Sequence, residues 1–167
     1  MLLKRGTHCF ISTKYDRLFV ACLNILVALD TSEEAGEVLD AATRLVRGKD
    51  VQITIVNVIK PLIGFYKDML PMMGDRDTTK SQAINQASIS LKTLADDKGI
   101  EPKSIDIILG SPAAEIRRKA EEINADVIVM VTQGNYGLGR LLGSNANGVL
   151  YGATRDLLAM KIQVESL

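Results

Sequence analysis

The sequence predicts an α/β domain in three layers, with a five-stranded parallel sheet and four helices. Three observations support this: short apolar runs recur along the chain, segments of helical periodicity lie between them, and the runs are rich in β-branched residues. Strands that alternate with helices are typical of βαβ units, and strands buried on both faces have this continuous apolar character. The 167 residues suffice for one domain, since a domain of about 150 residues buries roughly 70% of the surface that its unfolded chain exposes.

The expected elements follow one another in regular order. The strands are expected at residues 25–29, 51–59, 104–109, 126–132 and 157–162. Helical apolar spacing lies between them, at 35–46, 84–95, 113–123 and 146–153, and Gly48 and Gly99 are suited to end the first two helices. Residues 61–79 contain two prolines and two glycines and follow neither period, so we expect a long connection there.

Local signals predict where two of the helices begin. Thr31 and Glu34 have the spacing of a capping box before the first helix, and Asp30, at the end of the first strand, is also suited to cap it. Before the third helix, Ser111 can cap the free amides, and Pro112 suits the first helical position.

The first 22 residues stand apart from this pattern, so we divide the chain into an N-terminal extension at 1–22 and an α/β domain at 23–167. The extension holds His8, Cys9 and Cys22, which are too few and too irregularly spaced for a zinc site or a redox motif. Charged residues interrupt its apolar stretches, so it fails as a signal peptide, and no run elsewhere approaches the roughly 20 apolar residues of a membrane span. We expect a cytoplasmic protein with free thiols and no membrane insertion.

The charges balance, with 20 basic and 20 acidic residues, which argues against nucleic acid as a partner and favours a small, specific ligand. Open parallel sheets bind such ligands beyond the carboxyl ends of their strands, where the strand order switches. The first strand ends at Asp30, and the fourth leads into a glycine-rich segment that ends at Ser144. Glycine lets backbone amides approach a phosphate, and the start of the next helix adds unpaired N–H groups. We expect this segment, 134–144, to cradle a polyphosphate.

Two common phosphate motifs do not fit the segment. Gly134 and Gly139 have the separation of a Walker A loop, but an arginine and a leucine follow where that motif needs lysine and a hydroxyl residue. Gly137, Gly139 and Gly143 hold one residue too many for a dinucleotide fingerprint, and they follow the fourth strand. The sequence therefore excludes a P-loop ATPase and the usual dinucleotide site.

The spacing from the end of the fourth strand resembles that of a known family. Val131-Thr-Gln-Gly134, then eight residues, then Gly143-Ser144 is similar to the universal stress protein pattern of glycine, two residues, glycine, nine residues, glycine and serine or threonine. The sequence departs from that pattern at Val131, which replaces the first glycine, and in a loop that is one residue shorter. Further similarity lies at 25–30, 56–58, 110–112 and 140–146, so the resemblance covers about residues 24 to 163.

The resemblance implies a Rossmann-like domain that forms a homodimer and, in one branch of the family, binds ATP. By position, Asp30 is implied to contact the adenosine end of the nucleotide, Val58 to flank the base, and Ala28 to lie near the ribose. Val131 stands at the first glycine position, beside the ribose, and Asn57 takes the place of a common histidine.

The same resemblance implies the phosphate contacts. Hydrogen bonds to the phosphates are implied from four positions, Gly134, Gly143, Ser144 and Asn145. Arg140 is implied to add a charge-assisted contact, and Mg²⁺ to arrive mainly on the nucleotide. From the residues alone, Ser144 is also suited simply to cap the last helix, and Arg140 to stand as a solvated charge.

We expect an ATP-binding regulatory protein of the stress response rather than an enzyme, although slow ATP hydrolysis stays open. A homodimer is expected through the apolar last strand, Leu157 to Ile162, whose edge would otherwise be left open, and a further regulatory partner is unidentified. One alternative is a dimeric adaptor of the same fold that does not bind nucleotide. A weaker one is an adenylating α/β enzyme, for which the sequence carries no signature motif.

Overall fold

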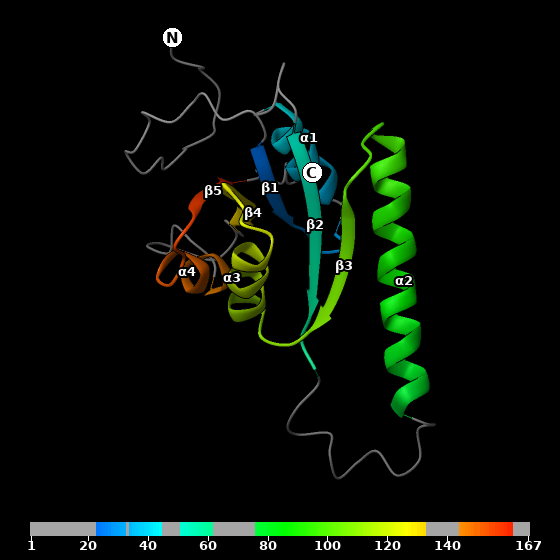
Figure 1. Ribbon diagram of the computed structural model, residues 1–167. Helices are drawn as coiled ribbons and strands as arrows, with labels where there is room; N and C mark the ends of the chain where they lie inside the picture. The colour runs from blue at the N-terminus through cyan, green and yellow to red at the C-terminus, as the bar shows by residue number, and fades with distance from the viewer. Residues whose placement is uncertain (1–22, 33, 45–50, 62–75, 133–143, 162–167) are drawn as a thin grey trace, which may run out of the picture.

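The described residues of the computed structural model form five strands and four helices, which confirms the predicted fold class (Figure 1). The structure describes residues 23–32, 34–44, 51–61, 76–132 and 144–161. In chain order the elements are β1 (Leu23–Ala28), α1 (Ala35–Arg44), β2 (Val51–Ile59), α2 (Arg76–Asp97), β3 (Ser104–Leu109), α3 (Pro112–Glu122), β4 (Val127–Thr132), α4 (Ser144–Leu150) and β5 (Asp156–Lys161). The strands form one sheet in the order β3-β2-β1-β4-β5, and every neighbouring pair is parallel.

Helices cover both faces of this sheet, and each face has its own hydrophobic core. The core beside α1 and α2 includes Leu91 of α2 and Val27 of β1. The core beside α3 and α4 includes Ile116 of α3 and Leu26 of β1. Figure 1 shows α2 alongside β3 at one flank of the molecule, and α3 with α4 at the other. Successive residues of β1 therefore lie in opposite cores, as the alternation of side chains along a strand requires.

The predicted boundaries hold best for the strands. β2 and β3 span the residues predicted for them, and the other strands differ by one or two residues at their ends. Gly99, with φ of 64°, follows the end of α2 as predicted. The connection predicted at 61–79 is too long, because α2 begins at Arg76. Gly48 and Ile162 lie outside the described residues.

The capping box predicted at Thr31 and Glu34 is wrong, because α1 begins only at Ala35. A cap at Thr31 requires the first helical residue to be the next one along. Instead, the amide of Ala35 donates to the carbonyl of Ser32 at 3.2 Å, so the chain makes an additional turn before the helix. This turn leaves Asp30 outside the helix, and the alternative role of Asp30 as a cap of this helix is also wrong.

α3 begins at the predicted residue but without the predicted side-chain bond. Ser111 is the N-cap residue in an extended conformation, and Pro112 follows in the first turn, yet the Ser111 hydroxyl makes no capping hydrogen bond. Proline has its φ fixed near the helical value, which favours the start of a helix at this point.

The apolar stripe predicted for the last helix is only partly correct. Ala146 and Val149 are buried, whereas Leu150 is 48% exposed. α4 ends at Leu150 and a turn follows, so Ala153 lies beyond the helix. None of the helices among the described residues has both the length and the apolar character that crossing a membrane requires.

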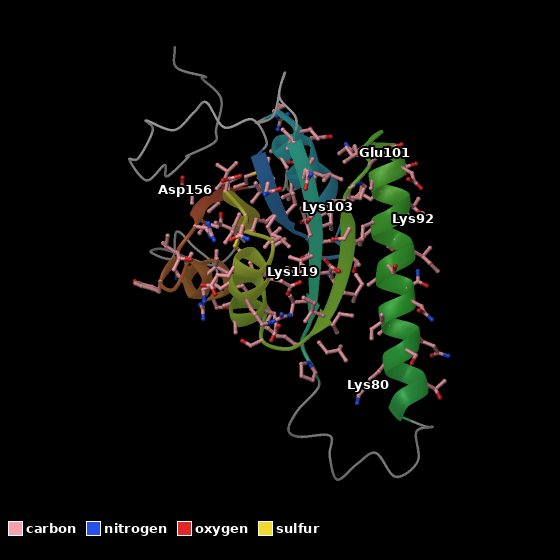
Figure 2. The ribbon with its side chains drawn as sticks, viewed as in Figure 1. Lys80, Lys92, Glu101, Lys103, Lys119 and Asp156 are labelled. Carbon is pink, nitrogen blue, oxygen red and sulfur yellow. The ribbon has the colours of Figure 1, made fainter. Side chains whose placement is uncertain are left out.

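Lys119 of α3 forms an ion pair with Asp106 of β3, the strand at one edge of the described sheet. Its ammonium group lies 3.1 Å from the carboxylate of Asp106 in β3 and 2.7 Å from that of Glu122, one turn along α3. Figure 2 places Lys119 between α3 and the strands, whereas Lys92 lies on the side of α2 away from the sheet. Hydrogen bonding to Glu122 and, secondarily, Asp106 raises the pKa of Lys119, and Lys119 lowers the pKa of Glu122, so both groups keep their charges near neutral pH.

Gly148 of α4 lies directly against Ala113 of α3. A Cβ atom added there would lie 2.8 Å from the Cβ atom of Ala113, which is closer than real Cβ atoms approach each other. The close approach of the two helices here therefore depends on a glycine facing an alanine, and Gly148 has no space for an added methyl group.

The contact between β1 and β2 continues to Leu29, one residue beyond the end of β1, through one backbone hydrogen bond and one from the buried side chain of Asn57. The amide of Leu29 donates to the carbonyl of Val56 at 2.9 Å, and Nδ2 of Asn57 donates to the carbonyl of Leu29 at 2.8 Å. Asn57 is only 6% exposed, and its Oδ1 atom has no partner among the described residues. Two hydrogen bonds thus fix the backbone of Leu29, the residue that immediately precedes Asp30.

We predict that Gly148→Ala destabilises the protein by about 1–3 kcal/mol through overpacking against Ala113, although alanine favours a helix over glycine. The double variant A113G/G148A relieves the contact and recovers most of the loss. Gly36→Ala in α1 is the matched control, because its new Cβ atom would make only ordinary van der Waals contacts, with Lys98 at 3.5 Å and Leu94 at 3.7 Å. Urea unfolding measures all three variants; equal effects of Gly36→Ala and Gly148→Ala would contradict the packing argument.

We predict that Asn57→Asp lowers the unfolding free energy at pH 7 by about 1–3 kcal/mol or more, because an ionised carboxylate cannot donate to the Leu29 carbonyl. Burial and the facing carbonyl raise the folded-state pKa of the new carboxyl group. The deficit relative to the unmodified protein is therefore smallest below the unfolded pKa of about 3.9 and grows as the pH rises through the folded pKa. The exposed Asn85→Asp is the control, and chemical unfolding at several pH values measures both; a deficit independent of pH would contradict this account.

Candidate functional site

The sheet has one switch point, between β1 and β4, among the strands that the structure describes. β1 pairs with β2 on one side and with β4 on the other, so Ala28 lies opposite both Val56 and Met130. The chain leaves β1 toward α1 and reaches α4 after β4, and these two helices lie on opposite faces of the sheet. Such divergence opens a crevice beyond the carboxyl ends of the two strands in α/β proteins. The predicted location of the site is therefore the edge formed by the ends of β1 and β4.

Asp30 lies at this edge, two residues after the last residue of β1, and is exposed. Its Oδ1 atom accepts hydrogen bonds from the backbone amide of Ser32, at 3.1 Å, and from the Ser32 hydroxyl, at 2.5 Å. The short side chain thus holds the turn that precedes α1. Oδ2 makes no hydrogen bond with the described residues, so one carboxylate oxygen is fixed in place and the other is available to a ligand.

Ala28 and Val58 share a face of the sheet close to Asp30. Both are half-buried and pack against the core beside α3 and α4. Val58 lies on β2, two residues beyond Val56, the register partner of Ala28. These two apolar side chains therefore form an apolar surface on the β2 side of the switch point.

Val131 is not brought together with these side chains. It packs, half-buried, against the core beside α1 and α2, on the opposite face of the sheet. Its register partner is Met160 in β5, which belongs to the same core. The methyl groups of Val131 therefore point away from the surface formed by Ala28 and Val58. At the carboxyl edge of the sheet, Val131 borders that surface only through its backbone.

Ser144 and Asn145 are the first two residues of α4, and both are exposed. Their hydroxyl and carboxamide groups are available as neutral hydrogen-bond donors on the β4 side of the switch point. The other residues predicted on this side, Gly134, Arg140 and Gly143, lie outside the described residues.

The charge of the edge is uneven. Glu34 follows Asp30 by four residues, and hydrogen bonding to the Ser32 side chain, which Asp30 shares, and to its own backbone lowers the pKa of Glu34. Two carboxylates beside the end of β1 repel phosphate, so an anionic ligand group would lie toward β4 and α4.

Two supporting residues of the edge were not predicted from the sequence. Asn57 anchors the peptide before Asp30, and Thr132, which is 3% exposed, donates its hydroxyl to the carbonyl of Met160 at 3.0 Å. Thr132 is the last residue of β4, so this bond joins β4 to β5 where the glycine-rich segment leaves the sheet. The signal that could have found both is a polar residue inside an otherwise apolar strand.

The described residues do not gather metal ligands. No group of three His, Cys, Asp or Glu side chains within the described ranges could hold a metal ion. The polar groups at the edge are instead a carboxylate, a hydroxyl and a carboxamide, which are groups that hydrogen-bond an organic ligand.

Solved structures share this architecture. The hypothetical protein MJ0577 superposes with a TM-score of 0.69 at 23% identity, covering 87% of this chain and 100% of that one. A universal stress protein in complex with cAMP gives 0.62 at 21% identity over 84% and 97% of the two chains. The universal stress protein of Archaeoglobus fulgidus in complex with dAMP gives 0.52 at 21% over 85% and 100%. At these identities the likeness concerns the fold.

Sequence comparison identifies the family. The model of the universal stress protein family matches residues 23–161, from the first residue of β1 to the last of β5. Universal stress protein A homolog 1 of Coxiella burnetii is 30% identical over 139 residues, which cover 82% of this chain and 94% of the relative. This chain is therefore a member of the universal stress protein family.

Proposed function

We propose that this protein binds ATP at the switch point between β1 and β4 and acts in the cytoplasm as a regulatory protein of the stress response rather than as an enzyme. The observation that carries the proposal is the exposed carboxylate of Asp30 on one side of the switch point, with Ser144 and Asn145 on the other. A nucleotide needs both halves: an acceptor for its sugar hydroxyls and donors for its phosphates.

The adenosine end belongs on the β1 side. Asp30 Oδ2 is free to accept a hydrogen bond from a ribose hydroxyl, the role that a carboxylate has in many nucleotide sites. Ala28 and Val58 supply apolar surface for the ribose and the base, and the backbone of Val131 borders the same region. Supporting this assignment, the two solved family members named above were obtained with cAMP and dAMP, both of which are adenine nucleotides.

The phosphates belong on the β4 side, away from the carboxylates of Asp30 and Glu34. There the proposal assigns backbone amides of Gly134 and Gly143, the side chains of Ser144 and Asn145, and the guanidinium of Arg140 to the phosphate oxygens. Mg²⁺ would enter on the nucleotide, held mainly by the phosphates.

The second candidate function is a dimeric adaptor of the same fold that does not bind nucleotide. The observation that favours it is the departure of residues 131–144 from the family spacing, by Val131 and by one residue of length. The placement of the Val131 side chain on the face opposite Ala28 and Val58 favours ATP binding over this alternative, since the extra methyl groups leave the base and ribose surface clear.

We predict that the purified protein binds ATP, and that Asp30→Asn weakens binding by about tenfold, because hydrogen bonds to charged groups contribute about 1.5–3 kcal/mol. Asp97→Asn at the exposed end of α2 is the matched control and leaves the affinity unchanged. Titration calorimetry measures the affinities, and mass spectrometry identifies any nucleotide released on denaturation. An absence of both heat and released nucleotide in the unmodified protein would favour the adaptor.

We also propose a homodimer formed through β5, residues 156–161. β5 is an edge strand that pairs with β4 alone among the described residues, so its outer backbone groups are open to a second copy. Pairing of two such edges satisfies those groups and joins two apolar strands.

We predict a particle of twice the 18.2 kDa chain mass in light scattering at micromolar concentration. Amide exchange places the interface: β5 amides become more protected as concentration rises, whereas those of β3, the other edge of the described sheet, do not. A monomeric mass, or protection at β3 instead of β5, contradicts the assignment.

A further inference from the structure

Side-chain hydrogen bonds join α3 and the turn after it to α4 and to the connection between α4 and β5. Arg117 donates from Nη1 to the carbonyl of Gly148 in α4. Glu121, one turn after Arg117, accepts a hydrogen bond from the Thr154 hydroxyl at 3.5 Å. Asn124, three residues further along, accepts one through Oδ1 from Nη2 of Arg155 at 3.3 Å. Arg117 and Glu121 are four positions apart and lie on the same side of α3, and Asn124 follows the end of the helix. The C-terminal half of α3 and the turn after it therefore both contact this part of the chain.

Of these contacts, the one made by Arg117 joins α3 to α4 itself. The carbonyl of Gly148 lies in the last turn of α4, where backbone acceptors lack a partner within the helix, and the guanidinium supplies that partner. The cation also lies at the negative end of the helix dipole. Gly152 encloses the guanidinium from the other side: a Cβ atom added there would lie 2.9 Å from Cζ and from Nε of Arg117.

α4 depends on such support because it is short. Seven residues make about two turns, and an isolated helix of that length is unstable in water. Gly148 is four residues after Ser144, so the two lie one above the other on the same side of α4. A bond that fixes Gly148 therefore fixes the direction in which the first turn, with Ser144 and Asn145, projects.

We propose that Arg117 is a positioning residue for the phosphate side of the nucleotide site, acting through Gly148 and the orientation of α4. It contacts no ligand itself. The inference rests on the proposed function for its consequence on ATP, but the hold of Arg117 on α4 exists in the unliganded protein and is tested there independently.

Arg118 provides a matched control. It is the next residue of α3, it is exposed, and it bonds to Glu115 at 2.8 Å and Glu122 at 2.9 Å, both within its own helix. Arg117→Ala and Arg118→Ala therefore make the same chemical change in the same helix, but only Arg117→Ala removes a contact to α4.

The first experiment measures amide hydrogen exchange without nucleotide. In Arg117→Ala, the amides of residues 148–152 are expected to exchange at least about tenfold faster, since a hydrogen bond to a charged group is lost, while α1 and β2 keep their rates. Arg118→Ala leaves residues 148–152 unchanged. Equal rates in the two variants overturn the proposal, whether or not the protein binds ATP.

The second experiment compares ATP with adenosine by titration calorimetry. Arg117→Ala is expected to weaken ATP binding by about tenfold and to leave adenosine binding unchanged, because adenosine lacks the phosphates that Ser144 and Asn145 would contact. An equal loss for both ligands indicates a merely structural role and overturns the proposal. If the unmodified protein binds neither ligand, the proposed function fails, and the exchange result alone decides whether Arg117 holds α4.

Two further variants keep the test decisive if Arg117→Ala unfolds. Arg117→Lys retains a cation that can donate to the Gly148 carbonyl, so it recovers part of the ATP affinity. Gly152→Ala displaces the guanidinium while keeping the arginine, and it is expected to reproduce the loss for ATP. Wild-type ATP affinity in Gly152→Ala, with exchange at 148–152 also unchanged, contradicts the assignment.

Discussion

The central position of β1 is the constraint on which the rest of the structure depends. β1 is paired on both sides, with β2 and β4, and its residues contribute to the cores on both faces of the sheet. Because the chain must leave this strand toward one face and return to the opposite face after β4, the carboxyl ends of these two strands are left without a crossing connection. The location of the candidate site is thus a consequence of strand order, and the polar residues at this edge determine its chemistry.

Much of the fold could be predicted from the sequence, because apolar periodicity reports burial directly. β2 and β3 match their predictions residue for residue, since both have sharp polar boundaries. The start of α1 could not be predicted from spacing alone. The carboxylate of Asp30 bonds to Ser32 in a local turn, and this turn competes with the capping box that Thr31 and Glu34 would form. Both arrangements fit the same sequence, and the structure has the local turn, with Ala35, the first residue of α1, buried in the core beside α1 and α2.

The candidate site was predictable in its location and less so in its internal arrangement. Asp30, Ala28 and Val58 lie at the edge that the strand pattern indicated. The opposite orientation of Val131 follows from simple alternation along β4, in which Met130 and Val131 face different cores. A polar residue inside an apolar strand marks the position of Asn57, but its partner could not be predicted, since Leu29 is 28 residues away and contributes only its backbone. When a side chain bonds to a distant backbone carbonyl, the residue type of the acceptor carries no information about the bond, so the pair cannot be found from the sequence.

The three polar side chains that support the edge have this property in common. Asn57, Thr132 and Arg117 each donate to a main-chain carbonyl, at Leu29, Met160 and Gly148 respectively. Every residue type has that carbonyl, so these bonds impose no chemical requirement on the side chains of their acceptors. The scaffold can therefore persist while the acceptor positions vary, within the space that packing allows. An architecture joined in this way can diverge widely in sequence, core side chains included, and keep the same edge open for a ligand.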